Sequence, residues 1–317
     1  MPVRVMMGKF PAIIFIVCAC VASSCGRGAR LPEDLSRAES ILDSRPDSSL
    51  IILDSASYSE SSGRYLYASY CLLRTFAEYN AYKPGIDDGM MNVGVDYFLK
   101  YGNRDRKAQA YYLRAVVRED NKTGNQADWA NDLLLATKEV KGSGNHMLAA
   151  MINLRYAVVL NDRKWYDASL PYLEKGLEEA EKAGSLAFQV TALINLSHRA
   201  LFLGDENKDY SEAIEYANRA AEISKGDDND YARALYNLGA CYSRNGQFDK
   251  ALECASTAVR AQERLFREGK RKARVRYAVL ADAFRKMNIP DSALFYAAKE
   301  MEASDLIAKL SGSQLSY

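Results

Sequence analysis

Three asparagines recur at one interval: Asn153, Asn195 and Asn237 stand 42 residues apart, and each is followed directly by a leucine. A side-chain amide carries both a hydrogen-bond donor and an acceptor, so it can pair with a peptide unit whatever side chain that unit bears. Each such bond contributes about 0.5–1.5 kcal/mol net, so three in a row would fix the register of a bound peptide more than its affinity. The alternative is that each amide bonds only to a neighbouring repeat of its own chain.

Residues that could do catalytic chemistry are few. The chain has two histidines, His146 and His198, and it carries no Gly-rich phosphate loop, no nucleophile motif and no zinc-ligand spacing. Its many carboxylates are expected to be solvated charges on helix surfaces. We therefore predict a protein without enzymatic activity, without a cofactor and without a metal site.

Other residues repeat together with the asparagines, and they predict the elements that position them. Framework leucines recur every 41 or 42 residues, at Leu72, Leu113, Leu154, Leu196, Leu238 and Leu280. Alanines spaced by three or four residues follow several of them and form one stripe of a helix, as in Ala251, Ala255 and Ala258. Breaks rich in Gly, Asn, Asp and Ser separate the periods, and strand patterns are nearly absent. The sequence predicts an all-α solenoid of about seven helical hairpins between Leu31 and Leu310.

One of these hairpins carries a pattern known from a family. The stretch from Leu235 to Tyr242, followed by Gly246, Phe248 and the alanine stripe, resembles a tetratricopeptide repeat (TPR). The resemblance extends over roughly residues 31–310. It implies a right-handed α-solenoid whose first helices line a concave face. It also implies a ladder of asparagines along that face that holds peptide backbone, as in some members of the family.

The neighbouring repeats depart from the family pattern. Ser197 and Ala281 stand where the family has a glycine, and Ala200 and Phe284 stand where it has a tyrosine. The period of 41–42 residues also exceeds the 34 residues of the family. The pitch of the superhelix therefore cannot be taken over from the resemblance.

Projection onto the first helices predicts an inner wall that changes character along the array. It is apolar around Leu154 and Leu196, and becomes polar and basic farther on. The predicted peptide-binding residues are Asn153, Asn195, Asn237, Tyr156, His198, Tyr236, Arg244, Arg285 and Lys286. An apolar-to-basic groove suits an extended peptide with a hydrophobic segment and an acidic group or C-terminal carboxylate. The alternative, that several of these side chains belong to the core between repeats, stays open.

The N-terminal residues predict where the protein is found. Arg4 and Lys9 precede an apolar run that ends in small residues directly before Cys25, a pattern that resembles a bacterial lipoprotein signal. The resemblance implies a signal peptide over 1–24, a lipidated Cys25, a tether over 25–30, a repeat domain over 31–310 and a flexible tail over 311–317. Since several acyl chains anchor a protein stably, we expect a lipid-anchored protein of the bacterial cell envelope, on the outer membrane facing the periplasm. An ordinary signal peptide and an uncleaved anchor are the alternatives.

Charge and cysteine content narrow the partners. Removal of Arg4 and Lys9 from the 42 basic residues leaves a chain nearly balanced by 41 acidic residues, which disfavours general nucleic-acid binding. Three cysteines follow Cys25 in the chain. They are Cys71, Cys241 and Cys254. An odd number cannot all pair within one chain, and pairing of the last two stays open.

These observations predict a non-enzymatic, membrane-anchored scaffold that binds a protein or extended peptide on its concave face. The Cys25 box and the two similar segments 46–50 and 290–294 also resemble envelope TPR lipoproteins of Bacteroidota. That resemblance leaves two alternatives. One is an extracytoplasmic partner of a sensor or regulator, and the other is a glycan-binding outer-membrane lipoprotein.

Overall fold

Helix-breaking residues and apolar stripes divide the chain into consecutive pairs of antiparallel helices. The structure is a computed structural model that describes residues 30–268 and 275–313. The predicted signal peptide, Cys25 and the tether up to residue 29 lie outside the described residues, as does the predicted tail beyond residue 313. Within the described ranges the chain forms fourteen α-helices and one short 3-10 helix, with no strand. The predicted all-α solenoid of about seven hairpins is confirmed.

The hairpins follow one another in chain order. They are α2 (Glu33–Ile41) with α3 (Pro46–Asp54), α4 (Arg64–Asn80) with α5 (Asp88–Tyr101), α6 (Arg104–Asp120) with α7 (Gln126–Val140), α8 (His146–Asp162) with α9 (Tyr166–Lys182), α10 (Leu186–Asn207) with α11 (Ser211–Ile223), α12 (Asp228–Arg244) with α13 (Phe248–Arg267), and α14 (Ala278–Lys286) with α15 (Pro290–Ser313). The 3-10 helix η1 (Glu60–Ser62) precedes α4. Helix α15 runs to Ser313, so the first part of the segment predicted as a tail is helical.

The predicted breaks supply the helix caps. Asn103, Asn145, Ser185 and Asp227 each accept a hydrogen bond from a backbone N–H in the first turn of the helix that follows. Such caps satisfy donors that a helix start leaves unpaired, which is worth about 1 kcal/mol each. The first helices of the middle hairpins consequently begin 40 to 42 residues apart, at Arg104, His146, Leu186 and Asp228.

The framework leucines form the core between the helices. All six lie in first helices, and none exposes more than 5% of its surface. The alanines of α11 and α13 are buried against them, with Ala217 and Ala258 fully covered. The predicted stripe fails only in α15, where Ala293 is half-buried and Ala297 is exposed. The physical reason is that no further hairpin covers this helix in the described part of the chain.

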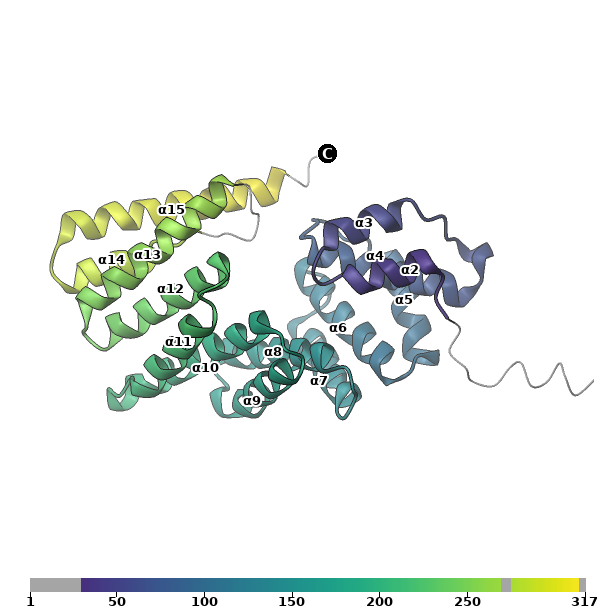
Figure 1. Cartoon of the computed structure of the whole chain (residues 1–317), viewed down its shortest axis with the longest axis horizontal. Helices are drawn as coiled ribbons and strands as arrows, with labels where there is room; N and C mark the ends of the chain where they lie inside the picture. The colour runs from purple at the N-terminus through teal and green to yellow at the C-terminus, as the bar shows by residue number, and fades with distance from the viewer. Residues whose placement is uncertain (1–29, 269–274, 314–317) are drawn as a thin grey trace, which may run out of the picture.

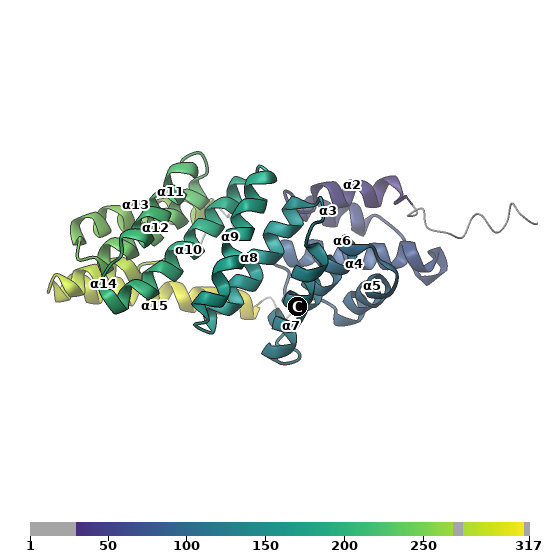
Figure 2. The same ribbon diagram turned by 90° about the horizontal axis from the view of Figure 1, so that it is seen from below.

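Helix contacts define the inside of the curve. Each first helix touches the next first helix along the array, from α2 to α14, whereas no two second helices of the described residues touch. The first helices therefore lie on the concave side, as the sequence predicted, and the second helices spread apart on the convex side. Figure 1 shows the resulting arch, with α2 and α3 at one end and α14 and α15 at the other. In the view from below, α2 lies higher than α15, so the two ends of the arch are offset from each other (Figure 2).

Helix α10 lies at the centre of this array. By length and composition it is the one helix of the described residues that could cross a membrane. It contacts α8, α9, α11 and α12 in the solenoid. Its apolar side chains, Leu193 and Leu196 among them, are buried in these contacts. They serve as the core of two neighbouring hairpins.

Candidate functional site

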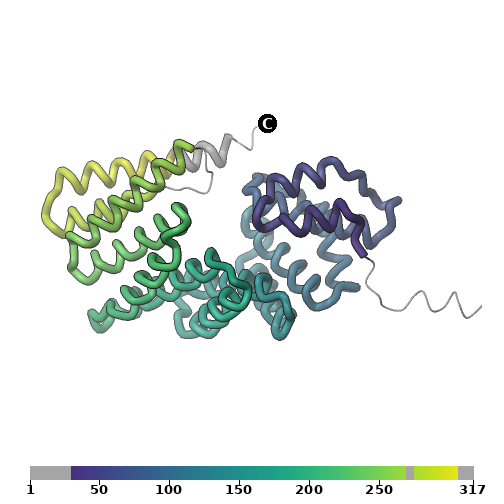
Figure 3. Tube along the Cα trace, viewed as in Figure 1, coloured from purple at the N-terminus to yellow at the C-terminus, as the bar shows by residue number. Residues whose placement is uncertain are grey.

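A cleft of about 1210 Å³ lies on the concave side, between the first two hairpins and the hairpins that begin with α10 and α12. Its N-terminal wall is formed by Ser44, Arg45, Pro46, Asp47, Ser48, Asn80, Ala81 and Tyr82. Its opposite wall is formed by Ala187, Phe188, Thr191, Asp227, Asn229, Asp230, Arg233 and Leu265. No helix of the first two hairpins touches a helix of the last three in the described residues, so the walls approach each other without packing together. Figure 3 shows the first hairpin, in purple, and the last hairpin, in yellow, on the same side of the arch.

Helix α10 presents one polar and aromatic stripe to this concave side. Thr191, Asn195, His198 and Phe202 follow one another at intervals of three or four residues, which places them on one helix face. Thr191 lines the cleft. The other three line a smaller pocket of about 280 Å³ beside the end of α8, where Phe202 stacks on Tyr166 with ring centroids 5.4 Å apart. The structure thus brings two predicted site residues, Asn195 and His198, into one pocket.

The pocket keeps His198 uncharged near neutral pH. Burial lowers the pKa of the imidazole, and the positive charges of Arg276 and Arg233 lower it further. A neutral imidazole has one donor nitrogen and one acceptor nitrogen. The pocket therefore offers hydrogen bonds and an aromatic wall rather than a charge.

The three asparagines have different surroundings. Asn237 is 1% exposed, and its Nδ2 donates to Ser197 Oγ at 2.8 Å in the preceding first helix. Asn153 is 7% exposed and donates to the carbonyl of Ala149, one turn back, at 2.7 Å. Asn195 makes the same type of bond within α10 but is only half-buried. Peptide binding by the asparagines stays a prediction, and the geometry leaves Asn195 as the member with its amide at a surface pocket.

The predicted basic end of the groove is already paired. Arg244 contacts Asp205 at 2.5 Å, and Arg285 and Lys286 contact Asp282 at 2.6 and 2.8 Å. Each carboxylate belongs to a first helix. Asp205 stands 39 residues before Arg244, close to one period, and this spacing is the signal in the sequence that could have identified the pair. The predicted basic residues are therefore ion-paired, Arg244 with the preceding first helix and Arg285 and Lys286 within α14.

The two predicted tyrosines of the wall pack between helices. Tyr156 of α8 meets Tyr172 of α9 edge to face, with ring centroids 4.7 Å apart. Tyr236 of α12 lies half-buried under the guanidinium of Arg276, which is 5.5 Å from the ring centroid. Both side chains therefore have a role in packing, which is the alternative that the sequence left open for several wall residues.

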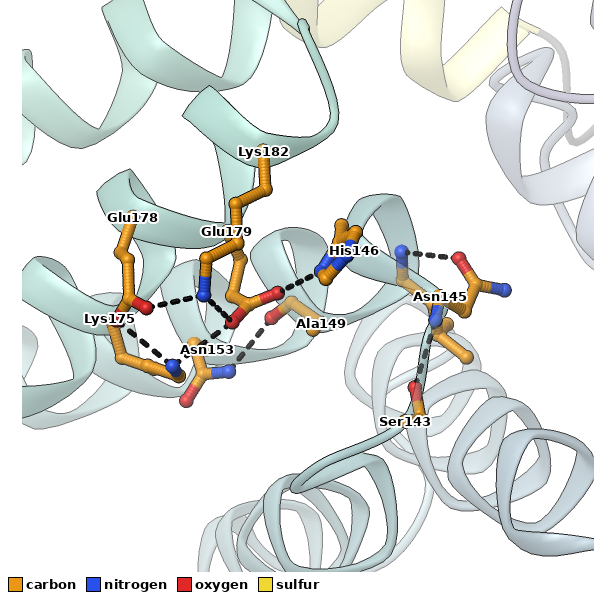
Figure 4. Close-up of polar contacts among 10 residues, drawn as sticks. Ser143, Asn145, His146, Ala149, Asn153, Lys175, Glu178, Glu179 and Lys182 are labelled. Carbon is orange, nitrogen blue, oxygen red and sulfur yellow. Dashed lines mark hydrogen bonds and ion pairs between the residues drawn. The ribbon is translucent and has the colours of Figure 1, made fainter.

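A second polar cluster, which sequence reasoning missed, joins α8 to α9. Glu179 is 6% exposed and accepts from three cationic or imidazole groups (Figure 4). His146 Nδ1 lies 2.6 Å from Oε2, while Lys175 and Lys182 lie 2.9 and 3.4 Å from Oε1. Burial would raise the pKa of Glu179, but the hydrogen bonds from His146 and Lys175 outweigh it and hold the pKa below its ordinary value. The cluster has no nucleophile and acts as a polar clamp within one hairpin.

The three cysteines that follow Cys25 are unpaired. Cys71 and Cys241 are buried and Cys254 is half-buried. Burial raises the pKa of each thiol to about 11, so the thiols stay protonated at neutral pH and are poor nucleophiles. The described residues contain no group of three or more His, Cys, Asp or Glu side chains placed to hold a metal ion.

Comparison with known proteins relates this geometry to a repeat family. Residues 206–264 and 230–304 match the model of the tetratricopeptide repeat. No curated protein sequence matches the chain. The apo form of RapI is similar in structure, with a TM-score of 0.62 and 15% identity over 86% of this chain and 76% of the other.

Two further structures show the same likeness. A Rap protein complexed with competence and sporulation factor has a TM-score of 0.64 and 14% identity, and the match covers 86% of this chain and 75% of that chain. Aspartyl phosphate phosphatase F from Bacillus subtilis has a TM-score of 0.55 and 13% identity, over 91% and 87%. Identities this low relate the folds alone. The C-terminal third of the array thus carries tetratricopeptide repeats by sequence, and the whole array has a TPR-like helical fold.

Proposed function

We propose that this protein is a non-enzymatic scaffold that binds an extended segment of a partner protein in the central cleft of its concave face. We further propose that it is anchored through a lipid on Cys25 in the bacterial cell envelope. The cleft carries the first part of the proposal, and the sequence pattern before Cys25 carries the second.

The size of the cleft favours a polypeptide over a small molecule. Its volume of about 1210 Å³ exceeds the roughly 300–1,000 Å³ typical of small-molecule pockets. Its walls combine hydroxyl and amide side chains, such as Ser48, Asn80 and Thr191, with exposed aromatic surface of Tyr82. Such groups can pair with peptide units and cover side chains without selecting one small ligand. One similar structure is a complex with competence and sporulation factor, which agrees with a cleft that holds a ligand.

The non-enzymatic part rests on how the ionisable groups are used. Buried thiols are protonated, Glu179 is held by its cations, and the basic residues of the wall are paired. Each of these groups is thus either protonated or already paired with another side chain. Since one similar structure is named a phosphatase, release of phosphate from an aspartyl-phosphate protein by the purified chain would contradict this part.

A photo-crosslinking experiment tests the binding surface. A benzophenone amino acid replaces Thr191 in the cleft or, as a control, Glu215, which is exposed on the second helix α11. Peptides selected from a displayed random library against the full chain should crosslink at position 191 and fail to do so at position 215. Equal crosslinking at both positions, or a library without binders, would overturn the proposal. Displacement of the peptides by oligosaccharides would favour the glycan-binding alternative.

The anchor is tested separately. Cells that express the full chain should incorporate labelled palmitate into it, and a Cys25→Ala variant should lose the label and leave the membrane fraction. Palmitate that persists in the variant would contradict lipidation at Cys25. This result leaves the binding experiment unaffected, because crosslinking at position 191 of the cleft does not depend on a lipid at Cys25.

A further inference from the structure

A second cavity lies on the concave side of the N-terminal half, enclosed by α2, α4, α6 and α8. Its volume is about 180 Å³. Leu42, Leu72, Phe76 and Leu148 form a buried apolar floor, and the more accessible Met151 borders it. An engineered apolar cavity of about 150 Å³ holds a benzene molecule. The cavity therefore has the size and polarity for one large apolar side chain, such as phenylalanine or leucine.

Two carboxylates stand at this cavity, and only one of them is neutralised. The carboxylate of Glu39 accepts from the guanidinium of Arg106, whose Nη1 and Nη2 lie 2.7 and 3.0 Å from Oε1 and Oε2. Arg106 also donates to Gln109 at 2.9 Å, so its charge is fully engaged. Asp43, one turn beyond Glu39, is solvent-exposed and makes no ion pair in the part of the chain that the structure describes. The mouth of the cavity thus carries one uncompensated negative charge.

The environment of Asp43 favours a cationic neighbour. Although the side chain reaches solvent, the surrounding concave wall partly desolvates its carboxyl and raises the pKa, and the negative charge of Glu39 raises it further. A hydrogen bond from Asn80 Nδ2, at 3.2 Å, holds the carboxylate in place and only partly offsets these effects. A positive group beside Asp43 would stabilise its charged form.

The cavity adjoins the central cleft through one hydrogen-bonded pair of residues. Asp43 lines the cavity, and its hydrogen-bond partner Asn80 lines the cleft. A peptide that lies in the cleft can therefore extend one side chain into the cavity without leaving the concave surface.

We propose that this cavity is a specificity pocket for a peptide residue pair: a large apolar side chain fills the cavity, and an adjacent lysine pairs with Asp43. The proposal rests on the proposed peptide-binding function and adds the class of sequence that is bound. It reverses the charge expected from the sequence, where a basic groove predicted an acidic partner. The reason is that the predicted basic residues already have carboxylate partners, Asp205 of the preceding first helix for Arg244 and Asp282 of the same helix for Arg285 and Lys286, whereas Asp43 has no cationic partner in the described residues.

The test uses capped peptides that contain Lys-Phe, Phe-Lys, Glu-Phe or Lys-Ala in one neutral sequence. Methyl-labelled methionine reports the site, because Met147 and Met151 border the cavity. At least one Lys/Phe peptide should shift the resonances of these two residues. Exchange of lysine for glutamate should weaken binding about three- to tenfold, the effect expected for one partly exposed charge pair. Exchange of phenylalanine for alanine should weaken it at least as much.

A matched pair of variants isolates the charge. In Asp43→Asn the Lys-Phe and Glu-Phe peptides should bind equally, whereas Asp96→Asn, an exposed aspartate on the second helix α5, should keep the full difference. A difference that survives Asp43→Asn would overturn the proposal, as would shifts confined to methionines elsewhere or no binding of any Lys/Phe peptide. If library peptides still crosslink at position 191 in that case, the pocket inference alone fails and the proposed function stands.

Discussion

Leu280 and Leu196 hold equivalent framework positions, but the solenoid predicts different consequences when each is truncated. Leu280 lies in the last hairpin, 3% exposed, in a cluster with Val259, Tyr277 and Val279. Leu→Ala at such a buried site removes apolar contacts and leaves a cavity, at a cost of about 2–5 kcal/mol. Since every 1.4 kcal/mol is a factor of ten, local opening of α14 and α15 should become about 30-fold to several thousand-fold more frequent.

Hydrogen–deuterium exchange read by mass spectrometry measures where that loss appears. In a solenoid each hairpin contacts only its neighbours, and among the described helices α14 touches α12, α13 and α15 alone. Leu280→Ala should therefore raise exchange in α14 and α15 and leave α4 to α8 protected. Leu196→Ala, the matched change in the central helix α10, should raise exchange in hairpins on both sides. Equal loss of protection along the whole chain in Leu280→Ala would refute the reasoning, because the array would then unfold as one unit.

Three further changes test single contacts by urea unfolding. Gly94→Ala would place a Cβ 2.9 Å from a backbone nitrogen of α4, and the free energy of unfolding should fall by about 1–2 kcal/mol after the gain in helix propensity is included. The control Gly226→Ala has open space around it and should change that free energy by less than about 0.5 kcal/mol. Arg114→Met removes the bidentate partner, at 2.6 and 2.8 Å, of the buried carboxylate of Asp132, and should lower the free energy of unfolding by about 2–4 kcal/mol. Adding Asp132→Leu should restore most of this loss, because no unpaired charge then stays buried. If stability does not recover, the ion pair itself is stabilising. The pKa of Glu179 is lower in the folded chain than in the unfolded chain, so the stabilisation that its carboxylate provides is present above about pH 4.3 and is lost as the pH falls through the folded-state pKa. The difference in unfolding free energy between the unchanged protein and Glu179→Gln should therefore shrink with acidification, and a difference that grows would contradict the assignment.

Prediction from sequence succeeded for residues whose surroundings follow from the local sequence pattern. A leucine that recurs at the framework spacing lies on the apolar face of its helix, and that face must be buried. A capping Asn or Asp marks the start of a helix, because its side chain accepts a hydrogen bond from a backbone N–H of the first turn. It was weaker for side chains whose surroundings come from another repeat. The sequence pattern predicted Arg244 as part of a basic groove, but in the structure Asp205 of the preceding first helix pairs with it. Asn237 looked like a ligand donor, yet Ser197 of the neighbouring helix accepts its amide hydrogen bond.

The sequence by itself determined that the chain is helical and that it repeats every 41 to 42 residues, whereas the inward position of the first helices was implied by the resemblance to the tetratricopeptide repeat. Periodicity and caps are local, so they need no knowledge of the rest of the chain. Only the tertiary structure decided the curvature that sets Ser44–Ser48 opposite α10 and α12, and which charges remain unpaired on the concave face. Those properties depend on small rotations that accumulate over seven hairpins and on contacts between residues about one period apart. For that reason the sequence could identify the asparagines that recur with the repeats, whereas Asp43 and the cavity beside it could be identified only in the folded array.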